Sequence, residues 1–169
     1  MAEEKINLEE LAGFLVKAKK ATYAGDGAEV ESQRPGFKEL EYKEGDWEYR
    51  DSYVGFFLAP GQEVVRFQGK PVWIMSYSGG MRENHQENEK FAHNVFAFLK
   101  KALSNVPKNK PFRGPQNFDE GELFKKGDFR YFNFIEGNIE NFSGLETITY
   151  KGEEVFRQKY IGGLVKGKN

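Results

Sequence analysis

The sequence predicts an α+β domain in which two helices pack on a mostly antiparallel sheet. The composition favours a sheet over a helical bundle, because 16 Phe and 19 Gly among 169 residues are typical of aromatic strands joined by turns. In addition, strand-like alternation occurs twice, each time after a segment with helical periodicity. With 38% hydrophobic residues, the chain is long enough for one well-buried core, and we expect a single domain over residues 1–169.

Two segments show the periodicity of amphipathic helices. The first helix is predicted over residues 8–20, and Asn7, with Glu10 three positions later, is a suitable N-cap. The second is predicted over residues 86–104, with a polar face that includes Glu89, His93 and Lys100. The apolar residues of the two helices recur three and four positions apart: Leu8, Leu11, Phe14, Leu15 and Ala18, then Phe91, Val95, Phe98, Leu99 and Ala102.

Strand-like alternation follows each helix. Residues 37–81 are expected to form about four strands, with turns at 43–46, 59–61 and 68–70. A second set of strands is predicted over 128–136, 144–150 and 153–162. The Gly-containing segment 21–36 and the Pro-rich segment 105–126 are interpreted as long loops, a length that is often functional in a compact domain.

The two strand-like regions also resemble each other. Residues 45–81 align with residues 127–164 when one extra residue is allowed near Asn141. Six of the eleven identities are Gly, which composition alone could produce, but the shared order of turns, aromatic residues and a preceding helix favours duplication. We expect two α-β-β-β halves, over 7–84 and 85–166, related by a pseudo-twofold axis with any ligand cleft between them. Convergent hairpins on unrelated strands are the alternative.

An ordered set of short motifs runs from about residue 8 to residue 165. The motifs are Tyr23-Ala24-Gly25, Arg34-Pro35-Gly36, Leu40, Tyr42, Asp51-Ser52-Tyr53, Gly69, Pro71-Val72-Trp73, Tyr77, Phe142-Ser143-Gly144, Glu146 and Tyr160-Ile161-Gly162-Gly163. By these motifs the chain resembles a bacterial and archaeal family, domain of unknown function 5680. The resemblance implies a protein that stands alone or is attached C-terminal to helix-turn-helix regulators, and it implies no activity. Because one helix alone precedes the first loop, no DNA-reading part is expected here.

The charge balance limits the classes of partner. With 25 basic and 26 acidic residues interspersed, the chain has no electrostatic footprint for nucleic acid or for an anionic membrane, so we expect neither as a partner. A small organic ligand and a second copy of the chain, forming a homodimer, are the partners left for consideration. The absence of Cys suits a reducing compartment, and the acidic start lacks the pattern of a signal peptide, so a cytoplasmic location is expected.

Asp51 is the first candidate site residue. Alternation along residues 47–55 places it on the same face as Trp47, Tyr49 and Tyr53. A buried carboxylate costs several kcal/mol unless it is hydrogen-bonded or paired. Asp51 therefore has either a structural role, in which it accepts a hydrogen bond from a tyrosine hydroxyl or a loop amide, or a functional role in a site. Asn133 takes its place in the second half, which makes the first half the charged and functionally more promising one.

Glu63 and Arg34 are the other polar candidates. Glu63 is either a solvated strand start or the partner of Asp51 in a carboxylate pair that would bind a cation or amine or share acid–base work. Arg34, beside Pro35 and Gly36, is suited to hold a carboxylate or phosphate, or it pairs internally with Asp51 or Glu63. The remaining candidates stack on a planar ligand or form core and pocket wall: Tyr23, Trp47, Tyr49, Tyr53, Trp73 and Tyr77.

No motif indicates a metal or a cofactor. His85, Glu89 and His93 are four residues apart, but ligands spread over two helical turns rarely converge on one ion. Neither a G-x-x-x-x-G-K-[ST] loop nor a strand–GxGxxG–helix unit occurs, and no serine elbow or H-E-x-x-H motif is present. No catalytic residue is therefore assigned.

Three classes of function follow. The leading hypothesis is a module that binds a small, effector-like organic ligand in an aromatic-lined cleft, with Asp51 and Arg34 as polar anchors. At the level of fold alone, duplicated α+β halves beside helix-turn-helix regulators are similar to gyrase-inhibitor-like effector-sensing domains. The second hypothesis is an enzyme with Asp51 or Glu63 as general base. The third is a structural or partner-binding protein, which would show an exposed apolar sheet face or edge strand.

Overall fold

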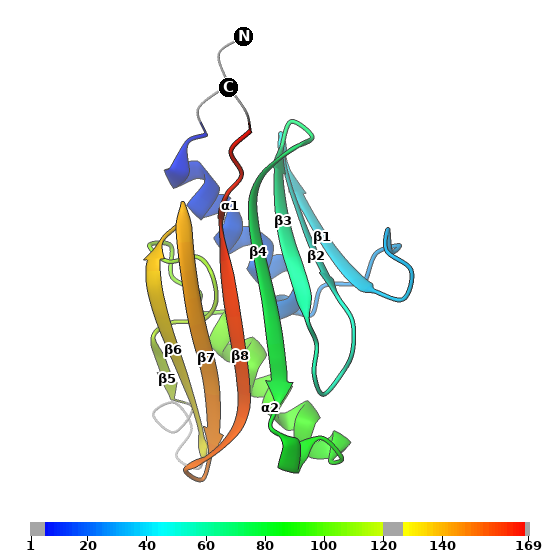
Figure 1. The fold of residues 1–169 in the computed structure, drawn as a ribbon, viewed down its shortest axis with the longest axis vertical. Helices are drawn as coiled ribbons and strands as arrows, with labels where there is room; N and C mark the ends of the chain where they lie inside the picture. Colours follow the sequence, from blue (N-terminus) through cyan, green and yellow to red (C-terminus); the bar gives the residue numbers. More distant parts are fainter. Residues whose placement is uncertain (1–5, 120–126, 168–169) are drawn as a thin grey trace.

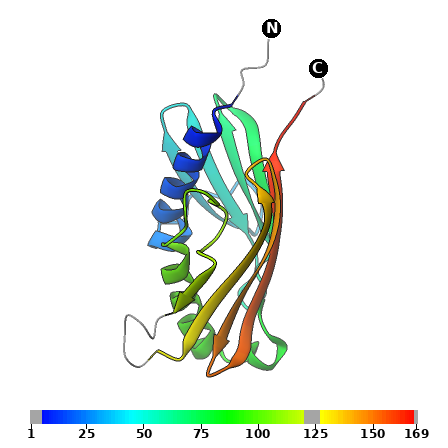
Figure 2. The same cartoon turned by 90° about the vertical axis from the view of Figure 1, so that its left-hand side faces the viewer.

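The computed structural model describes residues 6–119 and 127–167. These residues form an α+β fold of two layers, in which both helices cover one face of a single eight-stranded sheet, and no helix of the described residues lies on the other face (Figures 1 and 2). Every pair of neighbouring strands is antiparallel. The predicted fold class and antiparallel sheet are therefore confirmed.

The sheet has the strand order β1-β2-β3-β4-β8-β7-β6-β5. β4 and β8 are thus neighbours at its centre, and β1 and β5 are its edges. The elements, in chain order, are α1 (Leu8–Ala21), η1 (Tyr23–Gly25), β1 (Lys38–Glu44), β2 (Trp47–Tyr53), β3 (Gly61–Phe67), β4 (Lys70–Met81), η2 (Glu83–His85), α2 (Glu89–Leu103), β5 (Asn117–Asp119), β6 (Phe129–Asn138), β7 (Asn141–Tyr150) and β8 (Glu153–Leu164).

Both helices begin at an asparagine cap. The Asn7 side chain accepts from the backbone N–H groups of Glu9 and Glu10, as the sequence predicts. α2 starts at Glu89, three residues later than predicted, because the side chain of Asn88 caps it by accepting from the Phe91 N–H. The preceding residues form the separate 3-10 turn η2.

Two strand predictions need correction. The segment 105–126 is not wholly a loop, because residues Asn117–Asp119 pair with β6 as the short edge strand β5. Within residues 6–119 and 127–167, four strands therefore follow each helix, where three were expected in each repeated unit. β7 begins at Asn141, three residues earlier than predicted, because Asn138 and Asn141 pair directly across a tight turn.

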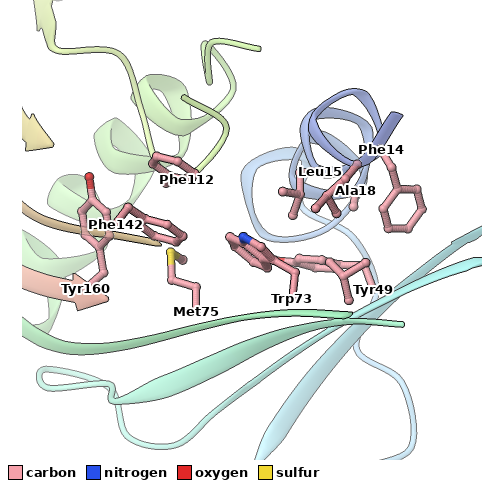
Figure 3. Close-up of a cluster of buried hydrophobic side chains, with 11 residues drawn as sticks. Phe14, Leu15, Ala18, Tyr49, Trp73, Met75, Phe112, Phe142 and Tyr160 are labelled. Carbon is pink, nitrogen blue, oxygen red and sulfur yellow. The ribbon is translucent and has the colours of Figure 1, made fainter. Parts of the chain in front are cut away.

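The core between helices and sheet is largely aromatic. The Trp73 ring stacks on Phe142 with centroids 5.6 Å apart, and the Phe112 ring stacks on the same Phe142 with centroids 3.8 Å apart. Figure 3 shows Trp73 between Tyr49, which lies beneath α1, and Phe142. Trp47, at the start of β2, stacks on Phe14 of α1 at 5.5 Å. These contacts fix α1 over β2 and β4.

Two glycines allow tyrosine rings to lie flat across a neighbouring strand. Gly61 is the register partner of Tyr77, and Gly144 is the register partner of Tyr160. A Cβ at either glycine would overlap the tyrosine ring. The absence of a side chain therefore lets each hydroxyl reach a polar residue one strand farther away, which is Asp51 for Tyr77 and Asn133 for Tyr160.

Replacing Gly144 by Ala is expected to lower the free energy of unfolding by about 1–3 kcal/mol, since the buried Tyr160 ring must move away from the new methyl group. Chemical denaturation measures the change. Gly13→Ala is the matched control: its Cβ would have Lys108 Cε at 3.8 Å, an ordinary contact within α1, and alanine should stabilise the helix by about 0.5–1 kcal/mol. A Gly144→Ala protein as stable as the wild type would contradict the prediction.

Candidate functional site

A cavity of about 220 Å³ lies between α2 and the sheet. Its residues come both from the segment 7–84 and from the segment 85–166. The polar side chains at the cavity are the buried Asp51, Arg113 and Gln158 and the half-buried Tyr77. The apolar wall is formed by Tyr53, Phe56, Phe96, Leu99 and Phe156. The cavity is smaller than the roughly 300–1,000 Å³ clefts that hold drug-sized molecules, so it suits a small ligand.

Asp51 is the buried acid of this cavity. It lies in the middle of β2, where strand alternation points it toward the helices, and 4% of it is exposed. The Tyr77 hydroxyl donates to Asp51 Oδ1 at 2.6 Å. Burial and the charge of Glu63 raise the pKa of Asp51 to about 7, against the opposing effects of the Tyr77 hydrogen bond, Lys19 and Arg113. Burial and the Asp51 charge also raise the pKa of Tyr77, so this hydroxyl remains a donor.

Arg113 brings a cation to the cavity from the connector between α2 and β5. Its Nε and Nη2 atoms lie 2.9 Å and 2.7 Å from Glu146 Oε1, and its Nη1 lies 3.8 Å from Glu63 Oε1. Burial by itself lowers the pKa of Arg113, but the charge and hydrogen bonds of Glu146 outweigh it and raise the pKa well above the usual value. Arg113 is thus a fixed cation with a carboxylate partner.

Glu146 and Glu63 are each held by neighbouring groups. Glu146 also accepts from the Tyr131 hydroxyl at 2.7 Å and from Gln158 Nε2 at 2.8 Å. Glu63 pairs with Lys19 of α1, and both side chains are buried. Burial lowers the pKa of Lys19, while the charge of Glu63 opposes that effect. Both glutamates therefore already have a cationic partner inside the protein.

The charges of this buried network do not cancel. With every group ionised, Lys19 and Arg113 supply two positive charges, and Asp51, Glu63 and Glu146 supply three negative ones. The excess charge belongs to Asp51, which makes no ion pair within residues 6–119 and 127–167, whereas Glu63 and Glu146 do. Burial is the main cause of the raised pKa of Asp51, and the negative charge of Glu63 adds to it.

The other ionisable side chains around the cavity have partners. Lys38 lies 3.4 Å from Glu29, Lys100 contacts Asp26, and His93 Nε2 lies 3.5 Å from Glu89. Lys100 also sits over the Tyr23 ring, 5.0 Å from its centroid. Among the charged side chains that line the cavity in the described residues, Asp51 is consequently the one without an ion pair.

The structure brings part of the predicted site together. Tyr23, Asp51, Tyr53 and Tyr77 all line the cavity. Glu63 is the register partner of Asp51 on β3, but it faces a separate small space of about 20 Å³ that it shares with Lys19 and Asp51. Of the two interpretations of Glu63, the solvated strand start is wrong, because Glu63 is buried beside Asp51, and its charge is balanced by Lys19.

Four other predicted residues lie outside the cavity. Tyr49 and Trp73 are fully buried beneath α1, and Trp47 packs on Phe14. Arg34 does not meet Asp51, because its loop crosses to the helix-free face, where its guanidinium donates to Gln62 at 3.0 Å. Gln62 precedes Glu63 in β3, so the two side chains point to opposite faces of the sheet.

Arg113 and Gln158 are the buried polar residues of the cavity that were not among the predicted site residues. The sequence signal for Arg113 was its place between a helix and its strands beside Gly114 and Pro115, similar to the setting of Arg34. Gln158 lies on the same face of β8 as the buried Phe156 and Tyr160, but a glutamine in a strand carries no sequence signal of its own for a binding site.

The helical histidines do not form a metal site in the structure. His85 Nε2 lies 3.1 Å from Glu153, and His93 contacts Glu89 and packs on Phe56. Within the described ranges, no three His, Cys, Asp or Glu side chains are grouped so as to hold an ion. No helix in this part of the chain is long and apolar enough to cross a membrane.

Fold and site together define an α+β protein with one open antiparallel sheet and a small cavity that contains an unpaired buried carboxylate. The family model described as domain of unknown function (DUF5680) matches residues 51–165, more than half of the chain, and the chain belongs to this family. The resemblance found in the sequence is thereby confirmed, although the motifs around Tyr23 and Arg34 precede the matched residues. Comparisons with curated proteins and with solved structures gave no match.

Proposed function

We propose that the protein is a binding module for a small organic cation, an amine with a compact aromatic or apolar body. The observation that carries the proposal is Asp51, the one charged side chain of the described cavity lining without an ion pair. A ligand ammonium group would supply the missing positive charge, and its apolar body would lie against Tyr53, Phe56 and Phe96. Aromatic faces add cation–π attraction for such ligands.

The hydrogen bonds around Asp51 support this proposal. Tyr77 uses Asp51 Oδ1, and Asp51 makes no other side-chain hydrogen bond within residues 6–119 and 127–167. Asp51 Oδ2 is not fully buried, in contrast to Glu39 Oε1, which is fully buried and has no hydrogen-bond partner. An acceptor that is reachable and unused at the end of an aromatic cavity is what an ammonium donor requires.

The second half of the chain offers a contrast. The Tyr160 hydroxyl donates to Asn133 Oδ1 at 2.6 Å, the same distance as between Tyr77 and Asp51. Asn133 Nδ2, however, donates to the Gly114 carbonyl at 2.8 Å. The connector that carries Arg113 thus occupies the space that stays open beside Asp51, which supports the first half as the ligand-binding one.

We further propose that residues 7–84 and 85–166 arose by duplication. The support comes from the structure as well as from the sequence. The pairing register of β3 with β4 shifts after Val65, and the register of β7 with β8 shifts after Ile148, which is the aligned position. The strand order on one side of the β4–β8 pair also mirrors the order on the other. A cytoplasmic location agrees with the lack of Cys.

The amine proposal predicts a thermal shift that depends on Asp51. Phenethylamine at about 100 times its Kd should raise Tm by about 5–10 °C at about pH 8, where Asp51 is ionised, and less at about pH 5. The neutral isostere phenethyl alcohol should give no comparable shift. Differential scanning fluorimetry, followed by calorimetric titration, makes the measurement.

The matched control is Asp46→Asn, since Asp46 is an exposed carboxylate in the β1–β2 turn. This variant should keep the amine response, and Asp51→Asn should lose it. Equal shifts with the amine and the alcohol would contradict the role of Asp51. If no member of a panel of small amines raises Tm, the proposed function itself is wrong.

A catalytic function is the second candidate. A carboxyl group with a pKa of about 7 is well suited to general base catalysis near neutral pH, and the Tyr77 hydroxyl beside it is a donor for a developing charge. Mass spectrometry of the amines after incubation distinguishes the two candidates, because a binding module returns its ligand unchanged.

A further inference from the structure

The helix-free face of the sheet is apolar over β6, β7 and β8. Phe134 and Ile161 are each 62% exposed there, and Phe132 is 45% exposed. Figure 1 shows this face, with the strands in front of the helices. Between the exposed side chains runs a groove of about 520 Å³, whose lining includes Phe134, Leu145 and Ile161. Large apolar side chains gathered on one surface are typical of an interaction site.

The corresponding face over β1 to β3 is polar. Arg50 and Gln62 occupy the positions that align with Phe132 and Leu145 in the sequence. Arg50 pairs with Glu39 and Glu41, and Gln62 accepts from Arg34 of the 21–36 loop. Within the described residues, the polar side chains of the helix-free face over β1 to β3 therefore have partners, whereas the apolar side chains over β6 to β8 are left uncovered.

Two opposite charges flank the apolar groove. Glu136 on β6 is in register with Ser143 on β7 and, one strand farther, with Ile161 on β8. Lys159 on β8 is in register with Leu145 on β7 and, one strand farther, with Phe134 on β6. Glu136 and Lys159 both line the groove. Neither forms an ion pair within residues 6–119 and 127–167, in contrast to Arg157, which pairs with Glu154.

We propose that this face binds a second copy of the chain to form a twofold-symmetric dimer. A twofold axis that lies in the interface and crosses β7 diagonally, from Phe134 on β6 toward Ile161 on β8, would place Glu136 of each copy over Lys159 of the partner subunit. Phe134 then packs near the axis against Phe134 of the partner subunit, and Ile161 packs against Ile161 of the partner subunit. Symmetry repeats the contact between Glu136 and Lys159 on the other side of the axis.

Charge complementarity favours a second copy over an unrelated protein. A twofold interface is stable when the patch complements itself, so that one residue contacts a second and the second contacts the first. Here an acid and a base stand on opposite sides of an apolar centre, two strands apart, and each lacks a partner within the described part of its own chain. Opposite charges at such a rim fix the orientation of the two copies.

The test is the mass of the full chain in solution, measured by sedimentation equilibrium over a range of protein concentrations. The wild type should approach twice the 19.4 kDa of one chain. Glu136→Lys and Lys159→Glu should each weaken the dimer by at least about tenfold in Kd, because each places like charges together. The double variant, with the two charges exchanged, should return to near wild-type affinity.

Further variants keep the proposal falsifiable. Phe134→Asp should give a monomer with an unchanged circular dichroism spectrum, and Leu58→Asp, a substitution of a comparably exposed apolar residue outside the groove, should remain dimeric. A wild-type mass of one chain at every concentration would overturn the proposal. A dimer that survives Phe134→Asp, or a charge exchange that fails to restore association, would show that the copies meet elsewhere.

Discussion

Arg113→Leu is expected to lower the free energy of unfolding by about 3–5 kcal/mol, the cost of leaving a buried charge without its partner. Glu146, which is 0% exposed, would lose its cation, and Glu63 would lose a nearby positive charge. Tyr131 and Gln158 would still donate to Glu146, but neutral donors do not balance a carboxylate in the core. Urea denaturation at neutral pH measures the loss.

Two comparisons separate the effect of charge from the effect of side-chain removal. Arg34→Leu removes an exposed guanidinium that donates to Gln62, and it should change stability by no more than about 0.5 kcal/mol. Combining Arg113→Leu with Glu146→Gln removes the uncompensated charge, so the double variant should be more stable than Arg113→Leu alone. A loss below about 1 kcal/mol in the single variant would be inconsistent with an essential buried ion pair.

Asp51→Asn is expected to stabilise the protein at about pH 8, by up to about 4 kcal/mol, and to leave it nearly unchanged at about pH 4. The pKa of Asp51 is raised from 3.8 to about 7 in the folded protein, so the native state binds this proton more tightly than the unfolded state does. Wild-type stability should therefore fall as pH rises from about 4 to about 7 and then level off. Asparagine carries no charge and can still accept from Tyr77, as Asn133 does from Tyr160.

Denaturation curves at several pH values test this expectation, with the exposed Asp46→Asn as the control that should follow the wild-type profile. An Asp51→Asn protein that is less stable than the wild type at about pH 8 would contradict it. Under the proposed function, the same substitution abolishes amine binding. The carboxylate would then be a feature that costs stability and is retained for its ligand.

Most of the fold could be predicted because its signals are local. Helical spacing located α1 and α2, and the asparagine at position 7 marked the start of α1. Alternation correctly placed Tyr49, Asp51 and Tyr53 on one face of β2. Alternation could not show which of these residues would lie under a helix, because that depends on where α1 packs. In the structure, Tyr49 belongs to the core and Asp51 lines the cavity.

The missing parts of the candidate site depend on the paths of two long loops. Arg34 and Arg113 have similar sequence surroundings, but the first loop carries Arg34 to the helix-free face and the second carries Arg113 into the core. A loop path is set by tertiary packing and has no periodicity to detect. The partner of Glu63 was hidden for a related reason, since Lys19 looks like an ordinary helix-terminal lysine in the sequence.

The central pairing of β4 with β8 has a consequence for how the protein folds. Its register joins Met81 to Phe156 and Trp73 to Leu164, whereas every other neighbouring pair in the sheet consists of consecutive strands. Consecutive strands close short loops and form early, while a distant pair must first overcome a large loss of chain entropy. We expect β4 and β8 to join late. Because the cavity takes Asp51 and Tyr77 from one side of this seam and Gln158 from the other, the chain would acquire its site only in the last step of folding.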